Sequence, residues 1–260
     1  MRIWVPHMPR FKLLIEYAGT RYSGWQIQKN ARTVAGEIDR AVREVTRRGE
    51  FELYGAGRTD AGVHALGQVA SCSLDRTIDP RTLTRALNYK LPHDVRVRRA
   101  RAMPPSFHAR FDAHQKTYRY RLWNGSVLSP FQCRYAWHLP GALDIAAMCD
   151  AARLVEGTHD FAAFQGQGSD RSTTTRTVNG LRIADCGSRI DFEISGNGFL
   201  RHMVRILVGT LVEIGRGRRD SRWVSEVMAS RDRNQAGQTA PAHGLFLVSV
   251  QYRHELAAEP

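Results

Sequence analysis

The chain has 260 residues, 42% of them hydrophobic and 24% charged, which fits a globular protein of one or two domains and excludes a disordered or collagen-like chain. Its 38 Lys and Arg residues outnumber its 25 Asp and Glu residues, and the formal net charge of +13 favours a polyanionic partner such as nucleic acid. The four cysteines are too widely spaced for a paired zinc motif, and no apolar run reaches the about 18 residues of a membrane span, so we expect a cytoplasmic protein with reduced thiols.

The first part of the chain predicts an α+β unit over residues 11–107. Apolar and more polar residues mostly alternate over 11–17, which is typical of a strand. Thr33 is the expected N-cap of a helix whose apolar residues recur at helical spacing, and Asp79-Pro80 predicts the start of a second helix. Further strands are predicted at 51–54, 69–74 and 95–99.

The same succession of elements restarts and predicts a second α+β unit over residues 108–254. A long helix is expected through 199–211, closed by the Gly215-Arg216-Gly217 stop. The other predicted elements are strands at 117–123, 181–183, 190–194 and 245–252 and helices at 144–155 and 223–230. Residues 1–10 are interpreted as a dispensable leader, because they precede the first periodic strand, and residues 255–260 as a tail.

The most unusual segment is the glycine-rich stretch Gly55–His64. Small residues surround Arg58 and Asp60, which allows a backbone or a planar ligand to approach closely. If the segment is extended, these two side chains project to the same face, and the guanidinium would keep the carboxylate ionised. Such a carboxylate could act as a nucleophile or base. For an arbitrary loop of this composition, a surface turn with an incidental ion pair is the more frequent case.

The text GRTDAGVHA in this stretch resembles the motif around the catalytic aspartate of the tRNA pseudouridine synthase A family. Five other segments resemble the family in order: IEYAGTRYSGWQIQ, FHARFDA, KTYRYRLW, NGFLRHMVRILVGTLVEIG and GLFLVSV. The resemblance implies an α+β fold of two related halves around a basic cleft, each half a mostly antiparallel sheet with helices on one face. It also implies a homodimer with no metal and no organic cofactor, and tRNA uridines 38, 39 and 40 of the anticodon stem-loop as substrate. Asp60 takes the catalytic position, with Arg58 beside it.

The resemblance also implies roles for residues of the second half. Tyr118 takes the position of a tyrosine that stacks on the target base, although a core tyrosine alternating with Tyr120 would give the same pattern. Arg205 takes the position of a second cation near the catalytic aspartate, and Arg201 is expected on the same side of one helix. Leu245 takes the position of an apolar residue near the base, while by itself it reads as the first residue of a core strand.

The mechanism that the resemblance implies starts with a base flipped out of the stem. Asp60 then acts as the carboxylate, either by attacking the sugar, by attacking the base or by abstracting a sugar proton. The histidines His64, His108 and His202 have no metal-site spacing and are interpreted as loop-stabilising or RNA-facing groups. Two alternatives stay open: a non-catalytic RNA-binding protein of RRM-like build, whose aromatic signature is absent, and a family member that modifies another uridine.

Overall fold

The computed structural model describes residues 8–47, 51–168 and 173–253, so most of the predicted leader and the predicted tail lie outside the described residues. The chain divides into two compact units. The first contains the chain up to His114 and again from Ser249 onward, and the second contains Gln115–Val248. The predicted boundary between residues 107 and 108 therefore lies inside the first unit.

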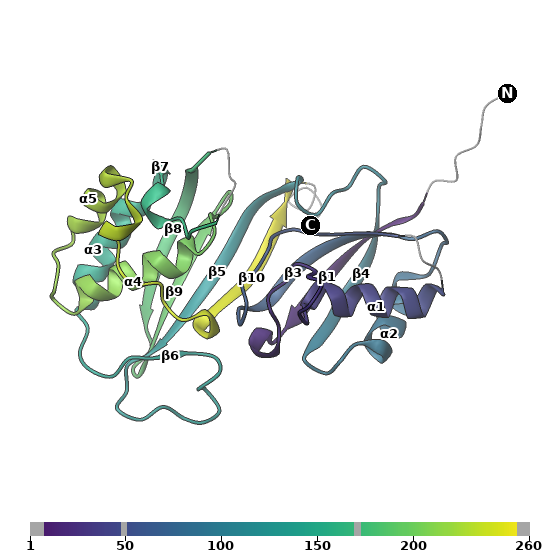
Figure 1. Ribbon diagram of the computed structural model, residues 1–260, viewed down its shortest axis with the longest axis horizontal. Coiled ribbons are helices and arrows are strands. Elements are labelled where there is room, and N and C mark those ends of the chain that lie inside the picture. Colours follow the sequence, from purple (N-terminus) through teal and green to yellow (C-terminus); the bar gives the residue numbers. More distant parts are fainter. Residues whose placement is uncertain (1–7, 48–50, 169–172, 254–260) are drawn as a thin grey trace, which may run out of the picture. The chain divides into compact units, whose positions relative to one another are not determined.

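The first unit is built on antiparallel strands with β1 between β3 and β4, and β2 paired to β3 (Figure 1). The strands are β1 (Arg10–Tyr17), β2 (Glu52–Gly55), β3 (His64–Ser73) and β4 (Val95–Met103). The helices are α1 (Val34–Thr46), α2 (Pro80–Lys90) and the short 3-10 helix η1 (Gly19–Arg21). Arg10, which the sequence assigned to the leader, is the first residue of β1.

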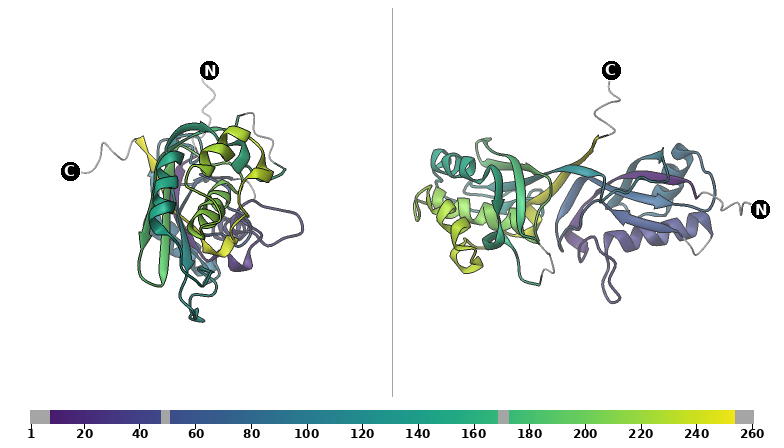
Figure 2. Two further views of the ribbon diagram at one scale, coloured as in Figure 1. Left: turned by 90° about the vertical axis from the view of Figure 1, so that its left-hand side faces the viewer. Right: turned by 90° about the horizontal axis from the view of Figure 1, so that it is seen from above.

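The alternation in β1 has the expected consequence for packing. Phe11, Leu13, Ile15 and Tyr17 are buried, and α1 and α2 lie together along one face of the strands (Figure 2). The two helix starts predicted for this unit are confirmed. The Thr33 side chain accepts a hydrogen bond from the Gly36 amide at 3.2 Å, which caps α1. Asp79 caps α2 in the same way, with Pro80 at the first helical position.

The second unit places its strands in the antiparallel order β5-β9-β8-β7, with β6 parallel to β5. The strands are β5 (Ala113–Trp123), β6 (Trp137–His138), β7 (Gly157–Asp160), β8 (Thr175–Asp185), β9 (Arg189–Gly196) and β10 (Leu245–Tyr252). The helices are α3 (Ile145–Val155), α4 (Met203–Gly215) and α5 (Trp223–Ser230), with 3-10 helices η2 (Ala162–Phe164), η3 (Arg233–Gln235) and η4 (Ala242–Gly244). Strands β5 and β10 each begin in one unit and end in the other.

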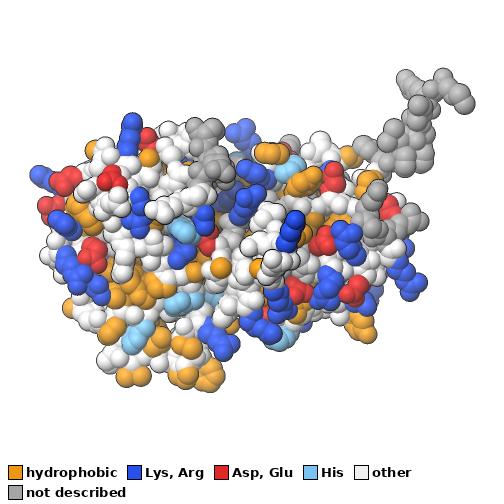
Figure 3. Space-filling model, viewed as in Figure 1, with side chains coloured by type: hydrophobic (Ala, Val, Ile, Leu, Met, Phe, Trp, Pro, Cys, Tyr) orange, Lys and Arg blue, Asp and Glu red, His pale blue; other side chains and the backbone are white. Residues whose placement is uncertain are grey.

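Helix α4 is buried on nearly all sides, as expected of an apolar helix inside a core, and it packs against α3, which in turn packs on β8. The α+β class and the mostly antiparallel pairing that the sequence predicted are confirmed. Within the described residues, no helix is long and apolar enough to cross a membrane. On the face drawn in Figure 3, Lys and Arg side chains are spread over the surface, in keeping with the net charge.

The prediction that Arg201 and Arg205 share one side of a helix is wrong. Helix α4 begins only at Met203, because His202 adopts a left-handed conformation with φ of 60° and breaks the helical path. Arg201 lies in the preceding turn, where its guanidinium donates to the backbone carbonyls of Gln167 and Gly168 at 2.8 and 3.1 Å. It therefore serves to hold a neighbouring loop.

Candidate active site

Asp60 lies in the loop that joins β2 to β3. Exposure alternates along this loop: Arg58 is exposed, Thr59 is only 7% exposed, and Asp60 is half-buried. The Asp60 carbonyl accepts a hydrogen bond from the Val63 amide at 3.2 Å, and Gly62 has a positive φ of 79°, so a tight turn follows the carboxylate directly. The loop thus points Thr59 into the core and leaves its two charged neighbours accessible.

A buried hydrogen bond holds the residue next to Asp60. The Tyr17 and Thr59 hydroxyl oxygens are 2.7 Å apart, and both side chains are buried. Gln68, fully buried on β3, donates from Nε2 to the Gly57 carbonyl at 2.9 Å. Burial raises the pKa of Tyr17 above its ordinary value, and hydrogen bonds with Thr59 and Gln68 oppose that shift. The phenol therefore stays neutral and the backbone before Asp60 is fixed to β1 and β3.

The segment Gly19–Trp25 braces the same loop from another side. The Trp25 amide donates to the Thr59 carbonyl at 3.0 Å, and the Gly62 amide donates to the Tyr22 carbonyl at 3.2 Å. Gly24 permits this approach, since its φ is +89° and a Cβ there would lie 2.5 Å from the Thr59 carbonyl oxygen. His64, 1% exposed, accepts from the Gly19 amide at 3.0 Å. Of its two expected roles, His64 therefore has the loop-stabilising one.

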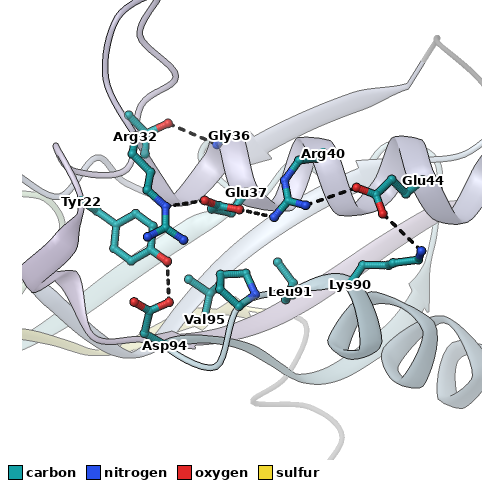
Figure 4. Close-up of polar contacts among 12 residues, drawn as sticks. Tyr22, Arg32, Gly36, Glu37, Arg40, Glu44, Lys90, Leu91, Asp94 and Val95 are labelled. Carbon is teal, nitrogen blue, oxygen red and sulfur yellow. Dashed lines mark hydrogen bonds and ion pairs between the residues drawn. The ribbon is translucent and has the colours of Figure 1, made fainter.

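A charged network fixes the bracing segment in turn (Figure 4). The Tyr22 hydroxyl donates to Asp94 at 2.6 Å, and the Arg32 guanidinium lies over the Tyr22 ring, 4.8 Å from its centre. Arg32 and Arg40 each donate to Glu37 of α1 at 2.5 Å. Burial alone would raise the pKa of Glu37, but the hydrogen bonds from Arg40 and Arg32 outweigh it and hold that pKa below its ordinary value. The network joins α1 and the turn before β4 to the segment that supports Asp60.

Among the residues that the structure describes, the Arg58 guanidinium does not form the ion pair with a carboxylate that the sequence analysis expected. Its side chain is exposed, and within the described parts of the chain no carboxylate lies within 4.0 Å of its guanidinium. An exposed guanidinium next to the loop is instead available to a phosphate or a base. Its assignment to substrate binding stays a prediction.

Tyr118 of the second unit lies on β5, on the same buried face as Tyr120 and Leu122. Its ring, 8% exposed, meets Phe199 edge-to-face with centres 5.2 Å apart. Tyr120 is fully buried, and its hydroxyl donates to the Pro241 carbonyl at 2.8 Å. Both tyrosines are therefore buried in the core of this unit, and the edge contact with Phe199 fixes the orientation of the Tyr118 ring.

Arg205 and Leu245 flank one connection in the second unit. The half-buried Arg205 of α4 donates from Nε to the Ala240 carbonyl at 2.7 Å, and the Ala240 amide donates to the Arg205 carbonyl at 3.1 Å. Leu245, 5% exposed, begins β10 directly after η4. Burial, with a contribution from the Arg205 charge, lowers the pKa of His243 between them. The structure thus groups Arg58 with Asp60 in the first unit, and Tyr118, Arg205 and Leu245 in the second.

Sequence reasoning missed the residues that hold the Asp60 loop. Tyr17 and Tyr22 read as ordinary aromatic residues, and their hydroxyl contacts are tertiary. Gln68 gave a weak signal, because a polar residue inside a buried strand usually has a hydrogen-bonding role.

Comparison with known proteins decides the family. The family model described as tRNA pseudouridine synthase matches residues 13–112 and 151–253. The chain belongs to the tRNA pseudouridine synthase family. Among its relatives are tRNA pseudouridine synthase A of Syntrophotalea carbinolica, 45% identical over 93% of this chain and 95% of the relative, and that of Acetivibrio thermocellus, 43% identical over 94% and 100%. tRNA pseudouridine synthase A 2 of Clostridium tetani is 42% identical over 93% of this chain and 98% of the relative.

Membership of the pseudouridine synthase family makes the chain an isomerase that converts uridine to pseudouridine in tRNA, which removes the RRM-like alternative. Arg58 and Asp60 lie in the first segment that the family model matches, and Arg205 and Leu245 in the second, whereas Tyr118 falls between them. A solved structure of an H/ACA RNP bound to a substrate RNA containing 2'-deoxyuridine is 11% identical, with a TM-score of 0.38 over 78% of this chain and 43% of that one.

Proposed function

We propose that this synthase modifies uridines 38, 39 and 40 in the anticodon stem-loop of tRNA, with Asp60 as its catalytic carboxylate. The observation that carries the assignment of Asp60 is the fixed loop: the buried Tyr17–Thr59 hydrogen bond and the Trp25 amide hold the backbone immediately before the carboxylate. A carboxylate held in one place can meet a flipped nucleotide without a large reorganisation. The position within the motif GRTDAGVHA supports the same residue.

The reaction breaks the bond from N1 of uracil to C1′ and forms a bond from C5 to C1′. The proton on C5 is lost and N1 gains one, so the product is an isomer of the substrate. A carboxylate can start this sequence by attacking the sugar, by attacking the base or by abstracting a sugar proton, and the proposal covers all three. Tyr118 is assigned to stack on the base and to accept the C5 proton late, and Leu245 to contact the base.

Arg205 and Arg58 have different proposed roles. Arg205 is half-buried and held by the Ala240 carbonyl, which suits a fixed charge that keeps a carboxylate ionised. Arg58 is exposed and suits a phosphate contact. The net charge of +13 supports tRNA as the partner, because phosphate neutralisation supplies most of the affinity of such complexes. A homodimer and a cytoplasmic location belong to the proposal through the family resemblance.

The test is an assay on unmodified tRNA transcripts. We expect the wild-type protein to release tritium from [5-³H]uridine-labelled tRNA and primer extension after carbodiimide treatment to stop at positions 38, 39 and 40. Asp60→Asn should abolish release in single turnover while tRNA affinity and thermal unfolding stay close to wild type, because the amide is nearly isosteric but a poor nucleophile. Stops at another uridine would refute positions 38, 39 and 40 as the modified sites, while the synthase activity itself would stand.

Asp39→Asn is the matched control. Asp39 is a half-buried aspartate of the same unit, paired with Arg43 on α1 at 2.7 Å, and it takes no part in the Asp60 loop. Its variant should keep full turnover. Substantial turnover by Asp60→Asn, in protein shown by mass spectrometry to be free of deamidation, would remove Asp60 from the mechanism.

A further inference from the structure

The FHARFDA segment contains a rigid turn that the proposed function does not use. The His108 amide donates to the Asp112 carboxylate at 2.9 Å, and the Asp112 amide donates back to the His108 carbonyl at 3.1 Å. His108 Nδ1 accepts from the amides of Arg110 and Phe111 at 3.1 and 3.3 Å, so the imidazole is held against its own turn. The turn is closed by four hydrogen bonds and has little freedom to collapse.

The turn is fixed to the first unit through Ala109, which is fully buried. The Ala109 amide donates to the Ser71 hydroxyl at 3.3 Å, and its carbonyl accepts from the Tyr252 hydroxyl at 2.7 Å. Ser71 stands in register with Tyr54 of β2 and with Lys12 of β1. Residues in register share one face of a sheet, and the neighbours of Lys12 along β1 point into the helix-covered core. The turn therefore lies on the sheet face that α1 and α2 do not cover.

Three aromatic rings form a stack at this turn. The ring of Tyr54 is 4.9 Å from that of His108, with 31° between their planes, and His108 is 4.3 Å from Phe111, with 34° between planes. The outer rings face solvent, since Tyr54 is 44% and Phe111 74% exposed. A fixed ring with so much exposed apolar surface is the arrangement that aromatic residues adopt where they receive another planar group.

Positive charges border the stack. The Arg110 guanidinium lies 5.6 Å from the centre of the Phe111 ring. Lys12 Nζ lies 4.3 Å over the Tyr252 ring, beside the anchor of the turn, and Arg101 of β4 stands in register with Lys12. Aromatic rings joined to a basic border are typical of surfaces that bind unpaired nucleotides, where the ring receives the base and the cations receive the phosphates. An apolar protein partner would not need this border.

We propose that Tyr54, His108 and Phe111 form a stacking platform for an unpaired nucleobase of the bound tRNA, with Arg110 contacting the adjoining phosphate. This inference rests on the proposed function, in that it takes tRNA as the substrate. It adds a binding contact through residues that lie outside the Asp60 loop. The platform contributes affinity and not chemistry, because none of its residues belongs to the catalytic assignment.

The test compares the affinity of variants for two RNAs. Phe111→Ala should raise the Kd for an unmodified tRNA transcript about tenfold, which corresponds to about 1.4 kcal/mol and lies within the range of one stacked base. Phe111→Trp should restore affinity, and Tyr54→Ala should reproduce the loss from a second element. The Kd for a blunt RNA duplex without unpaired bases should not change. Tyr89→Ala is the control, because Tyr89 is 85% exposed on α2 of the same unit. A cation also lies near its ring, Lys90 Nζ at 5.6 Å, but among the described residues no second aromatic ring contacts it.

Three results would overturn the platform. The first is a tRNA Kd that Phe111→Ala leaves unchanged, and the second is an equal loss on tRNA and duplex. The third is a change in the light-scattering mass of free Phe111→Ala protein, which would make the surface an interface between copies. Failure of the proposed function is distinguishable, because it would appear in the wild-type protein as an absence of pseudouridine. Failure of the platform would appear only in the variants.

Discussion

The Tyr17–Thr59 hydrogen bond gives the sharpest test of how the fold positions Asp60. The two hydroxyl oxygens are 2.7 Å apart, near the preferred O–H···O distance, and the side chains are only 3% and 7% exposed. Leaving one of two buried partners unsatisfied costs about 1–3 kcal/mol, whereas replacing both by apolar groups is nearly neutral. Tyr17→Phe leaves the Thr59 hydroxyl without its phenol partner. Thr59→Val leaves the Tyr17 hydroxyl with Gln68, so we expect it to cost less.

The double variant Tyr17→Phe, Thr59→Val should therefore be more stable than the sum of the single losses predicts. We expect a coupling energy of about 1 kcal/mol or more, measured by urea unfolding of all four proteins. Each single variant should also lower single-turnover pseudouridine formation, by up to about a hundredfold, because a small displacement of a catalytic group can cost that much. Affinity for tRNA should stay unchanged, since neither hydroxyl is accessible.

Thr46→Val is the control that distinguishes the general effect of losing a buried hydroxyl from the specific effect of displacing Asp60. Thr46 is 5% exposed in the same unit and donates to the Val42 carbonyl at 2.9 Å, remote in sequence from the Asp60 loop. Its variant should lose stability and keep turnover. Additive losses in the cycle, or an equal loss of turnover in Thr46→Val, would refute the reasoning.

Three further predictions concern tRNA binding, Tyr118 and acid stability. The association constant for tRNA should fall linearly in a plot of log K against log salt, with a slope of about −0.7 to −0.9 per phosphate contacted, and a flat plot would contradict the electrostatic argument. Tyr118→Phe should keep tRNA affinity and slow tritium release, and wild-type rates would limit Tyr118 to stacking. Because the pKa of Glu37 is lowered in the folded protein, ionised Glu37 stabilises the fold at pH values above its ordinary pKa of 4.5. This stabilisation is lost as the pH falls through the folded-state pKa. The stability difference between wild type and Glu37→Gln in urea titrations should therefore shrink in acid, and a constant difference would remove the role of the Arg32 and Arg40 hydrogen bonds.

Local signals in the sequence were sufficient for most elements. Alternation identified β1, and the caps Thr33 and Asp79 located the starts of α1 and α2, because a side chain that accepts a backbone N–H acts within three residues. The start of α4 could not be predicted in this way. His202 adopts a left-handed conformation, and the preceding residue, Arg201, donates hydrogen bonds to the carbonyls of residues 167 and 168. Contacts between residues so far apart in the chain leave no local pattern in the sequence. The short strands β6 and β7 were missed for the same reason.

For the candidate site, too, local sequence signals were sufficient for some features and tertiary contacts were needed for others. Asp60 was assigned from its motif, since a carboxylate between small residues is by itself an ambiguous signal. The hydrogen bonds that hold its loop join residues far apart in the chain, such as Tyr17 with Thr59 and Gly19 with His64. Only the folded strands bring these pairs together. The assignment of Asp60 therefore came from the sequence and stays a prediction, whereas the contacts that hold its loop became visible only in the structure.

The return of the chain to the first unit at Ser249 has a consequence for biosynthesis. Tyr252 packs edge-on against Phe107 and bonds to the Ala109 carbonyl, so the last described strand completes the unit that carries Asp60. The whole of the second unit, Gln115–Val248, is translated before that strand emerges. The first unit to be synthesised is thus the last to be finished, and a nascent chain that stalls late would expose its unclosed sheet to chaperones and proteases.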